Sequence, residues 1–194
     1  EKVLKKEGLE SNKPTVLAFG GSQGAKKIND AIVEIIKNKQ HESYQMIWAT
    51  GPKQYDAIKE ELKVSGFDIE KLNNIKAIPY IYNMEELMNS VDVIVSRSGA
   101  MTITEISNLG KPSILIPLPN VSHNHQLYNA KVLENVGAAK IILNDELNGK
   151  TLAEAIETIT KSEDIIARMG KNALKVSTSD VENKIYNEIK KLIK

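Results

Sequence analysis

The chain has 194 residues, and 41% of them are hydrophobic, which is enough for one sizeable domain with a core of its own. The 26 basic and 25 acidic residues leave a formal net charge of +1, so the overall charge does not favour nucleic acid or an anionic surface. Cysteine is absent, which excludes disulfides and cysteine-based zinc sites. We expect no nucleic-acid partner, because the sequence also lacks a basic run with interleaved aromatic residues.

The first 12 residues are rich in charge and begin without an initiating methionine. This pattern predicts that residues 1–12 are a linker from a missing N-terminal domain and that the sequence is a fragment of a longer protein. Residues 13–194 contain no low-complexity tract, internal repeat or obvious second domain. We therefore predict that they form a single domain.

Short apolar runs bounded by glycine or proline alternate along the chain with stretches of helical spacing. The apolar runs predict strands at Val16–Phe19, Met46–Ala49, Ile75–Ile78, Val91–Val95, Ile114–Ile116 and Ala138–Ile142. The spacing predicts helices at roughly Ala25–Asn38, Gln54–Val64, Met84–Asn89, Met101–Leu109, Gln126–Val136, Leu152–Thr160, Asp164–Leu174 and Val181–Ile193. Strands that alternate with helices indicate βαβ units. We therefore predict an α/β fold, with a Rossmann-like parallel sheet and helices on both of its faces.

The first predicted strand runs into a glycine-rich turn, Gly20–Gly24, and a predicted helix follows at once. Strand, glycine turn and helix in that order present backbone N–H groups to a phosphate. The turn does not match a nicotinamide-binding fingerprint, because the second strand ends without a carboxylate. It is no P-loop either, and the later Gly149–Thr151 has Asn144 where that motif needs its first glycine. A tight turn that binds no ligand is the alternative.

A second candidate turn follows the fourth predicted strand, in the segment Arg97–Glu105. Gly99 suits the start of a helix, where the N–H groups of Ala100–Thr102 point outward at the positive end of the helix dipole. Glu105 shares a helical face with Thr102, so its carboxylate could accept hydrogen bonds from a ribose diol. As alternatives, Thr102 and Glu105 only cap the helix, and Arg97 forms an ion pair at the edge of the sheet.

A third polar segment, Pro117–Ala130, follows the fifth predicted strand and enters a helix. His123, His125 and Gln126 cluster there, but no acidic residue or cysteine joins them, so we predict no metal site. Hydrogen bonding to a sugar or a phosphate fits these side chains better. All three segments lie at the carboxyl ends of predicted parallel strands, where such sheets bind their ligands.

Four motifs together resemble the MurG family, the bacterial UDP-N-acetylglucosamine:undecaprenyl-pyrophosphoryl-N-acetylmuramoyl-pentapeptide N-acetylglucosamine transferases. They are GGSQGA (Gly20–Ala25), SRSGAMTITEI (Ser96–Ile106), GKPSILIPLP (Gly110–Pro119) and HNHQLYNA (His123–Ala130). From about Lys13 onward, the chain is similar to the C-terminal, UDP-GlcNAc-binding half of these two-domain GT-B enzymes.

The resemblance implies a role for each part of the candidate site. Ser22 and the amides of the second turn would hold the diphosphate, the backbone of Ile81 would read the uracil edge, and Glu105 would hold the ribose. The implied donor-binding residues are Ser22, Ile81, Ala100, Met101, Thr102, Ile103, Thr104, Glu105 and Gln126. Secondary candidates are Gly21, Gln23, Met84, Arg97, Gly99, His125 and Asn129.

The contact with the GlcNAc is left open between two neighbours. Some family members have Gln-Gln where this chain has His125-Gln126, and the loop before them is one residue longer here. The resemblance favours Gln126, with Asn129 close by, but His125 is the alternative.

The resemblance also implies an inverting, metal-independent hexosyl transfer from UDP-GlcNAc to lipid I, which makes lipid II in peptidoglycan synthesis. The C4 hydroxyl of the muramoyl sugar would attack C1 of GlcNAc, and UDP would leave. Aligned amides at helix N-termini can stabilise the departing diphosphate without a metal. No cofactor is expected, and the catalytic base would lie in the missing domain, so we expect no catalytic residue in this chain and no activity from it alone.

As partners, the family resemblance implies UDP-GlcNAc, lipid I bound through the missing domain, and the cytoplasmic membrane surface. The implied location is cytoplasmic and peripheral, on the inner face of a bacterial membrane. Three other functions stay open: the donor-binding subunit of a two-chain GlcNAc transferase, a UDP-GlcNAc 2-epimerase, and a UDP-sugar binding module that is inactive by itself.

Overall fold

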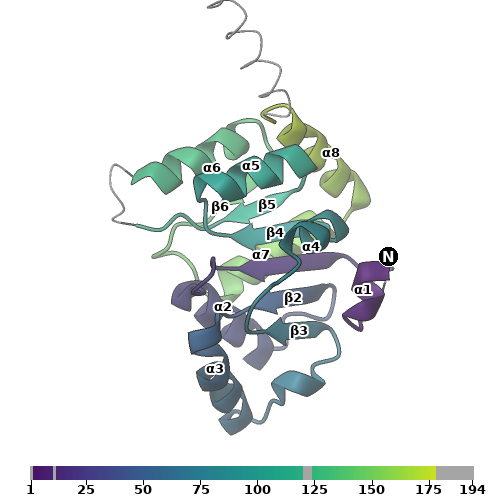
Figure 1. The fold of residues 1–194 in the computed structure, drawn as a ribbon, viewed down its shortest axis with the longest axis vertical. Coiled ribbons are helices and arrows are strands. Elements are labelled where there is room, and N and C mark those ends of the chain that lie inside the picture. The colour runs from purple at the N-terminus through teal and green to yellow at the C-terminus, as the bar shows by residue number, and fades with distance from the viewer. Residues whose placement is uncertain (1, 11, 120–123, 178–194) are drawn as a thin grey trace, which may run out of the picture.

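The computed structural model describes residues 2–10, 12–119 and 124–177, and in these ranges six parallel strands form one sheet (Figure 1). The strands are β1 (Thr15–Phe19), β2 (Gln45–Ala49), β3 (Ile75–Ile78), β4 (Val93–Ser96), β5 (Ser113–Leu115) and β6 (Ala139–Ile141). Their order across the sheet is β3-β2-β1-β4-β5-β6. All six predicted strands are confirmed, with ends that differ by at most two residues.

Helices follow the strands as predicted. They are α1 (Lys2–Lys6), α2 (Lys26–Lys37), α3 (Pro52–Val64), α4 (Met84–Ser90), α5 (Ala100–Leu109), α6 (His125–Asn135), α7 (Gly149–Thr160) and α8 (Glu163–Leu174). A short 3-10 helix, η1 (Ile69–Lys71), and α1 were not predicted. The helix predicted at Val181–Ile193 lies outside the described residues.

Helices cover both faces of the sheet, as the α/β prediction requires. In Figure 1, α4 lies in front of the sheet and α7 lies behind it. The alternation of side chains along β1 divides the core in two: Val16 and Ala18 join α2, α3 and α7 in one cluster, whereas Leu17 and Phe19 join α1, α4, α5 and α6 in the other. Helix α8 adds residues to both clusters. Burial of β1 on both faces is typical of a central parallel strand.

The segment predicted as a linker is packed against the domain. Leu4 and Leu9 are each only 6% exposed and belong to the same core cluster as α4. The sequence did not predict this contact, because two leucines among charged residues in such a short segment give no clear hydrophobic period. That residues 1–12 connect to a preceding domain stays a prediction.

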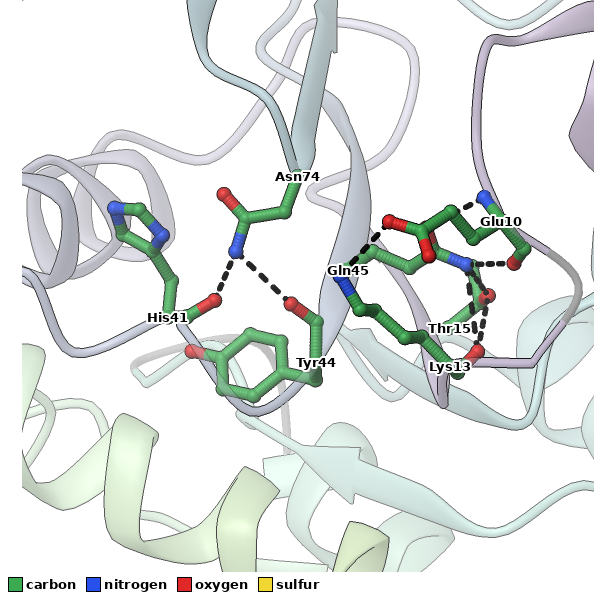
Figure 2. Close-up of polar contacts among 7 residues, drawn as sticks. All are labelled: Glu10, Lys13, Thr15, His41, Tyr44, Gln45 and Asn74. Atoms are coloured by element: carbon green, nitrogen blue, oxygen red, sulfur yellow. Dashed lines mark hydrogen bonds and ion pairs between the residues drawn. The ribbon is translucent and has the colours of Figure 1, made fainter.

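The amino ends of β1, β2 and β3 are joined by side-chain amides (Figure 2). Gln45 accepts a hydrogen bond from the backbone N–H of Glu10 at 2.9 Å and donates to the backbone oxygen of Glu10 and to Thr15 Oγ1. Asn74 donates to the backbone oxygen of Tyr44 at 3.1 Å. The bonds of Gln45 fasten the chain before β1 to the amino end of the sheet, and the bond of Asn74 joins the amino ends of β2 and β3.

The carboxyl ends of the central strands are level with each other. Phe19 at the end of β1 is opposite Ala49 of β2 and Ser96 of β4 in the register of the sheet. The chain moves outward from β1 in one direction through β2 and β3, and in the other through β4, β5 and β6. The crevice outside this switch point is where open parallel sheets bind ligands.

Candidate functional site

The glycine-rich segment after β1 forms a tight turn at the switch point. The N–H of Gly24 donates to the backbone oxygen of Gly21 at 3.0 Å, which closes a turn with Ser22 and Gln23 at its tip. Both tip residues are exposed. The turn delivers the chain directly into α2.

The N-terminus of α2 is open. Ala25 occupies the N-cap position and offers no side-chain cap, and the first helical bond runs from the N–H of Asn29 to Ala25 at 3.0 Å. The N–H groups of Lys26 and Lys27 therefore have no hydrogen-bond partner among the described residues. Lys26 pairs with Asp30 at 2.8 Å, and this hydrogen bond raises the pKa of the Lys26 ammonium group.

The N-terminus of α5 is open as well. Gly99 is its N-cap and lacks a side chain, and the first helical bond runs from the N–H of Ile103 to Gly99 at 3.0 Å. The three amides of Ala100–Thr102 are left without a partner in the described part of the chain. No side chain caps this helix, and neither Thr102 nor Glu105 makes a capping hydrogen bond among the described residues.

The two open helix starts face one cavity of about 570 Å³. Lys26 and Lys27 line it from α2, and Gly99 and Thr102 line it from α5. Among the predicted site residues, Gly21, Gly99, Arg97, Thr102 and Gln126 line this first cavity.

A second cavity of about 250 Å³ adjoins the first. Phe19, Gly21 and Thr102 line both, so the two cavities form one groove across the switch point. Among the predicted site residues, Gly21, Ser22, Ile81, Met84, Thr102 and Glu105 line the second cavity. Ile81 is buried, whereas Glu105 is exposed and makes no hydrogen bond or ion pair to another described residue.

Arg97 lines the first cavity with a half-buried guanidinium. Its Nη1 donates to the backbone oxygens of Ile116 at 3.0 Å and Pro117 at 3.3 Å. The ion pair considered as an alternative for Arg97 is not formed among the described residues. Partial burial lowers the pKa of Arg97 from its ordinary value, but a guanidinium stays charged in proteins. An anion in the cavity would therefore meet a positive charge that has no carboxylate partner in the described ranges.

Ser98 connects the start of α6 to the turn after β4. Its hydroxyl donates to the backbone oxygen of Gln126 at 2.7 Å, and its own backbone oxygen accepts from the side chain of Asn129 at 3.1 Å. The side-chain oxygen of Gln126 accepts from the N–H of Leu118 at 3.0 Å. The amide nitrogen of Gln126 has no partner among the described residues, and Gln126 lines the first cavity. His125 and Asn129 are absent from the linings of both cavities, as far as the described residues extend.

Other predicted site residues lie outside the groove lining. Met101 is 74% exposed, the side chain of Ile103 packs against the core, and the hydroxyl of Thr104 donates to the backbone oxygen of Ala100 at 3.1 Å. The amide of Ile103 is already used by the helix. Gln23, at the tip of the glycine turn, lines neither cavity. In this part of α5, a ligand would therefore meet mainly the backbone amides of Ala100 and Met101.

The sequence reasoning missed several residues that line the groove. Lys26 and Lys27 had a readable signal, because two basic residues in the first turn of a helix after a glycine turn suit an anion. Tyr80 lines the second cavity and makes an edge-to-face contact with Tyr82, with ring centroids 5.1 Å apart. Asn144 lines the first cavity from the loop after β6. No local sequence pattern predicts that contribution.

Two further observations concern metal ligands and membrane-spanning helices. Among the described residues, no three histidine, cysteine or acidic side chains are grouped so that they could hold a metal ion. The same part of the chain contains no helix with the length and apolar character needed to cross a bilayer.

Comparison with known proteins supplies a family. Residues 15–185 match the model of the glycosyltransferase family 28 C-terminal domain. The chain is 40% identical to a UDP-N-acetylglucosamine--N-acetylmuramyl-(pentapeptide) pyrophosphoryl-undecaprenol N-acetylglucosamine transferase of Thermoanaerobacter sp. (strain X514), over 98% of this chain and 53% of the relative. It thus spans about half the length of such relatives.

Solved structures have the same fold. The crystal structure of MurG from Acinetobacter baumannii is similar with a TM-score of 0.79 and 27% identity, over 96% of this chain and 52% of that one. A UDP-GlcNAc 2-epimerase from Neisseria meningitidis bound to UDP-GlcNAc has a TM-score of 0.66 at 15% identity, over 98% of this chain and 47% of that one. At that identity the epimerase shows the fold alone.

Proposed function

Because the chain belongs to the family of glycosyltransferase family 28 C-terminal domains, we propose that it is the donor-binding half of an N-acetylglucosaminyltransferase. In this proposal the complete enzyme transfers GlcNAc from UDP-GlcNAc to lipid I and makes lipid II for peptidoglycan. The transfer inverts the configuration at C1 of GlcNAc.

The convergence of two open helix N-termini on one groove carries this proposal. Amides at the starts of α2 and α5 have no partner among the described residues, and both helices line the same cavity at the switch point of the sheet. A diphosphate is dianionic or more at neutral pH, and it accepts several hydrogen bonds at once. Amides at a helix N-terminus supply such donors together with the positive end of the dipole.

The order of residues along the groove fits the order of groups in UDP-GlcNAc. Ile81 and Glu105 line the second cavity, which would take the uridine. The backbone of Ile81 would contact the uracil, and the carboxylate of Glu105 would contact the ribose diol. Gln126 lines the first cavity and not the second, so the first cavity would take the GlcNAc. Thr102 lines both cavities, between these two ends, where the diphosphate would lie.

The mechanism needs this half to bind the donor and to stabilise its leaving group. As the bond from C1 of GlcNAc to the diphosphate breaks, negative charge grows on the phosphate oxygens. Open amides of α5 and the guanidinium of Arg97, which has no carboxylate partner among the described residues, lie at the groove to stabilise that charge. The base that takes the proton from the acceptor hydroxyl belongs, in this proposal, to the half of the enzyme outside this chain.

The acceptor and the location also belong to the complete enzyme. The names of the relatives contain pyrophosphoryl-undecaprenol, a lipid carrier that resides in a membrane. We therefore propose that the other half binds lipid I at the cytoplasmic face of a bacterial membrane, and that this chain meets UDP-GlcNAc from the cytoplasm.

Calorimetric titration with UDP and UDP-GlcNAc in EDTA tests the donor site. We expect both ligands to bind the chain without a divalent metal, since helix amides and Arg97 supply the positive potential. A strict need for magnesium or manganese would contradict the proposal. Addition of lipid acceptor to the complete enzyme should release UDP, whereas the truncated chain should bind UDP-GlcNAc and release none. Conversion of UDP-GlcNAc into its C2 epimer would point to an epimerase instead.

A further inference from the structure

A chain of side-chain hydrogen bonds runs from the core to the glycine turn. Trp48 Nε1 donates to Asn29 Oδ1 at 2.9 Å, and Asn29 Nδ2 donates to Gln54 Oε1 at 3.0 Å. Gln54 Nε2 then donates to the backbone oxygen of Gln23 at 3.3 Å, at the tip of the turn. Trp48 is fully buried and Asn29 is 2% exposed, so the chain of bonds is anchored in the core.

The indole fixes the direction of every bond in this chain. An indole N–H can only donate, so the oxygen of Asn29 must face Trp48 and its nitrogen must face the other way. That nitrogen also donates to the backbone oxygen of Thr50 at 2.8 Å, which can only accept. Gln54 must therefore present its oxygen to Asn29, and its own nitrogen is left to donate to Gln23.

The backbone around Gln23 is closely packed against the turn after β2. Gly24 has φ +76°, and a Cβ on it would lie 2.0 Å from the backbone oxygen of Thr50. Gly51 has φ +88°, and a Cβ on it would lie 2.4 Å from the backbone oxygen of Gln23. The turn after β1 thus lies directly on the turn after β2, and the side chain of Gln54 occupies the remaining place beside them.

We propose that Gln54 is a positioning residue that holds the glycine turn in its ligand-binding shape. Gln54 lines neither cavity of the groove, so it acts through Gln23. A trans peptide has its C=O and N–H on opposite sides. Rotation of the Gln23–Gly24 peptide would turn its carbonyl oxygen toward Gly21, whose own oxygen now accepts from the N–H of Gly24. The bond from Gln54 opposes that rotation and keeps Ser22 and Gly21 at the groove.

The experiment compares two substitutions of Gln54 with a control on the same helix. Gln54→Ala removes the donor, and Gln54→Glu replaces the donor nitrogen by an oxygen that repels the carbonyl of Gln23. Lys53→Gln changes the net charge by the same amount as Gln54→Glu, at a neighbouring exposed residue that has no ion pair within the described residues. For each protein we would measure UDP affinity by calorimetry, the melting temperature, and the hydrogen-exchange rate of the Gly24 amide without ligand.

We expect Gln54→Ala to weaken UDP binding about fivefold and Gln54→Glu at least about twentyfold, while Lys53→Gln stays within about twofold of the wild type. Exchange of the Gly24 amide should accelerate in both Gln54 variants, although their melting temperatures stay near that of the control. Unchanged exchange and affinity in both variants would overturn the proposal, as would a loss of affinity that merely follows the loss of melting temperature.

The affinity measurement rests on the proposed function, but the exchange measurement does not. Failure of the wild-type protein to bind UDP would contradict the proposed function, and the exchange rate of Gly24 would still decide the role of Gln54. Binding by the wild type with no difference among the variants would contradict only the role of Gln54.

Discussion

Helices α5 and α7 both follow a strand of the same sheet, yet the N-terminus of α7 is capped by side chains and that of α5 is not. At α7, Asn148 accepts from the N–H of Thr151 at 3.0 Å, and Thr151 Oγ1 accepts from the N–H of Asn148 at 3.1 Å. A third bond comes from outside the helix, because the N–H of Gly149 donates to Glu34 of α2 at 2.6 Å. At α5, the N-cap is Gly99 and no side chain binds the first amides in the described part of the chain.

The difference separates a helix start that the fold itself caps from one that stays open for the proposed ligand. A capping box contributes about 1 kcal/mol to stability, and the protein forms one at α7. At α5 that contribution is forgone, and the open amides border the groove beside Arg97. Gly149-Lys150-Thr151 has the sequence of the end of a phosphate-binding motif, but the amides of Gly149 and Thr151 already donate to Glu34 and Asn148.

The largest effect is expected when α5 is also given a capping side chain, by Gly99→Asp. The backbone of Gly99 is extended, with φ −63° and ψ 151°, and a Cβ there would meet nothing within 4 Å, so the substitution fits. We expect the free energy of unfolding to rise by about 1 kcal/mol and UDP affinity to fall about a hundredfold, because the new carboxylate occupies the amides and repels the diphosphate. Thermal melting and calorimetry measure the two effects.

Gly99→Ala is the matched control, since it adds a Cβ without an acceptor. It should bind UDP nearly as the wild type does. If Gly99→Asp stabilises the fold and still binds UDP normally, the N-terminus of α5 is not the diphosphate site.

The next largest effect concerns the carboxylate beside the open helix start. Glu105→Ala should weaken UDP binding by about 1.5–3 kcal/mol, the range of a charge-assisted hydrogen bond, with little change in melting temperature. Stability should hold because Glu105 is exposed and has no partner among the described residues. Glu85→Ala, which removes an exposed carboxylate from α4, is the control for net charge. Parallel losses of affinity and melting temperature would argue for a structural role.

A smaller and more selective effect is expected at the start of α6. Gln126→Ala should leave UDP affinity nearly unchanged and lower UDP-GlcNAc affinity by about 1–2 kcal/mol, because Gln126 would contact only the sugar. Discrimination against the C4 epimer of the sugar should weaken as well. Calorimetry with UDP, UDP-GlcNAc and that epimer makes the comparison.

His125→Ala is the second arm of that comparison. Gln126 lines the first cavity and His125 does not, so His125→Ala should bind all three ligands as the wild type does. A sugar-specific loss in His125→Ala alone would assign the contact to His125.

The smallest effect on UDP binding is expected at α7, whose N-terminus is capped. Asn148→Ala removes the cap of α7 and should lower the free energy of unfolding by about 1 kcal/mol, as measured by denaturant titration. UDP affinity should not change, because no residue of α7 lines the groove in the described part of the chain. Lys150→Ala, in the same turn, controls for a general effect of substitution. A weaker UDP complex with Asn148→Ala would mean that α7 also serves the ligand.

Much of the fold could be predicted from the sequence. The alternation of apolar runs with helical spacing gave all six strands and the helices α2 to α8. Helix α1 could not be predicted, because the burial of Leu4 and Leu9 depends on the surface that α4 offers and not on any local period. For the site, the turns after β1 and β4 were predicted from the sequence to bind a ligand, and the structure brings both to one groove. The contribution of Asn144 was not, since it comes from a loop that only the fold brings to the groove.

The sequence by itself determined the local chemistry of this protein: a glycine turn before α2, a glycine instead of a capping side chain before α5, and Asn148 with Thr151 before α7. Each of these follows from residues within a few positions of one another, where backbone and side chain meet whatever the rest of the chain does. Only the tertiary structure decided what those features face. The parallel pairing of β1 with β4 places two distant turns on one groove, and the packing of α2 beside α7 gives Glu34 to Gly149. Such contacts depend on the order of strands in the sheet, which is fixed by burial of the whole core and cannot be read from any single stretch.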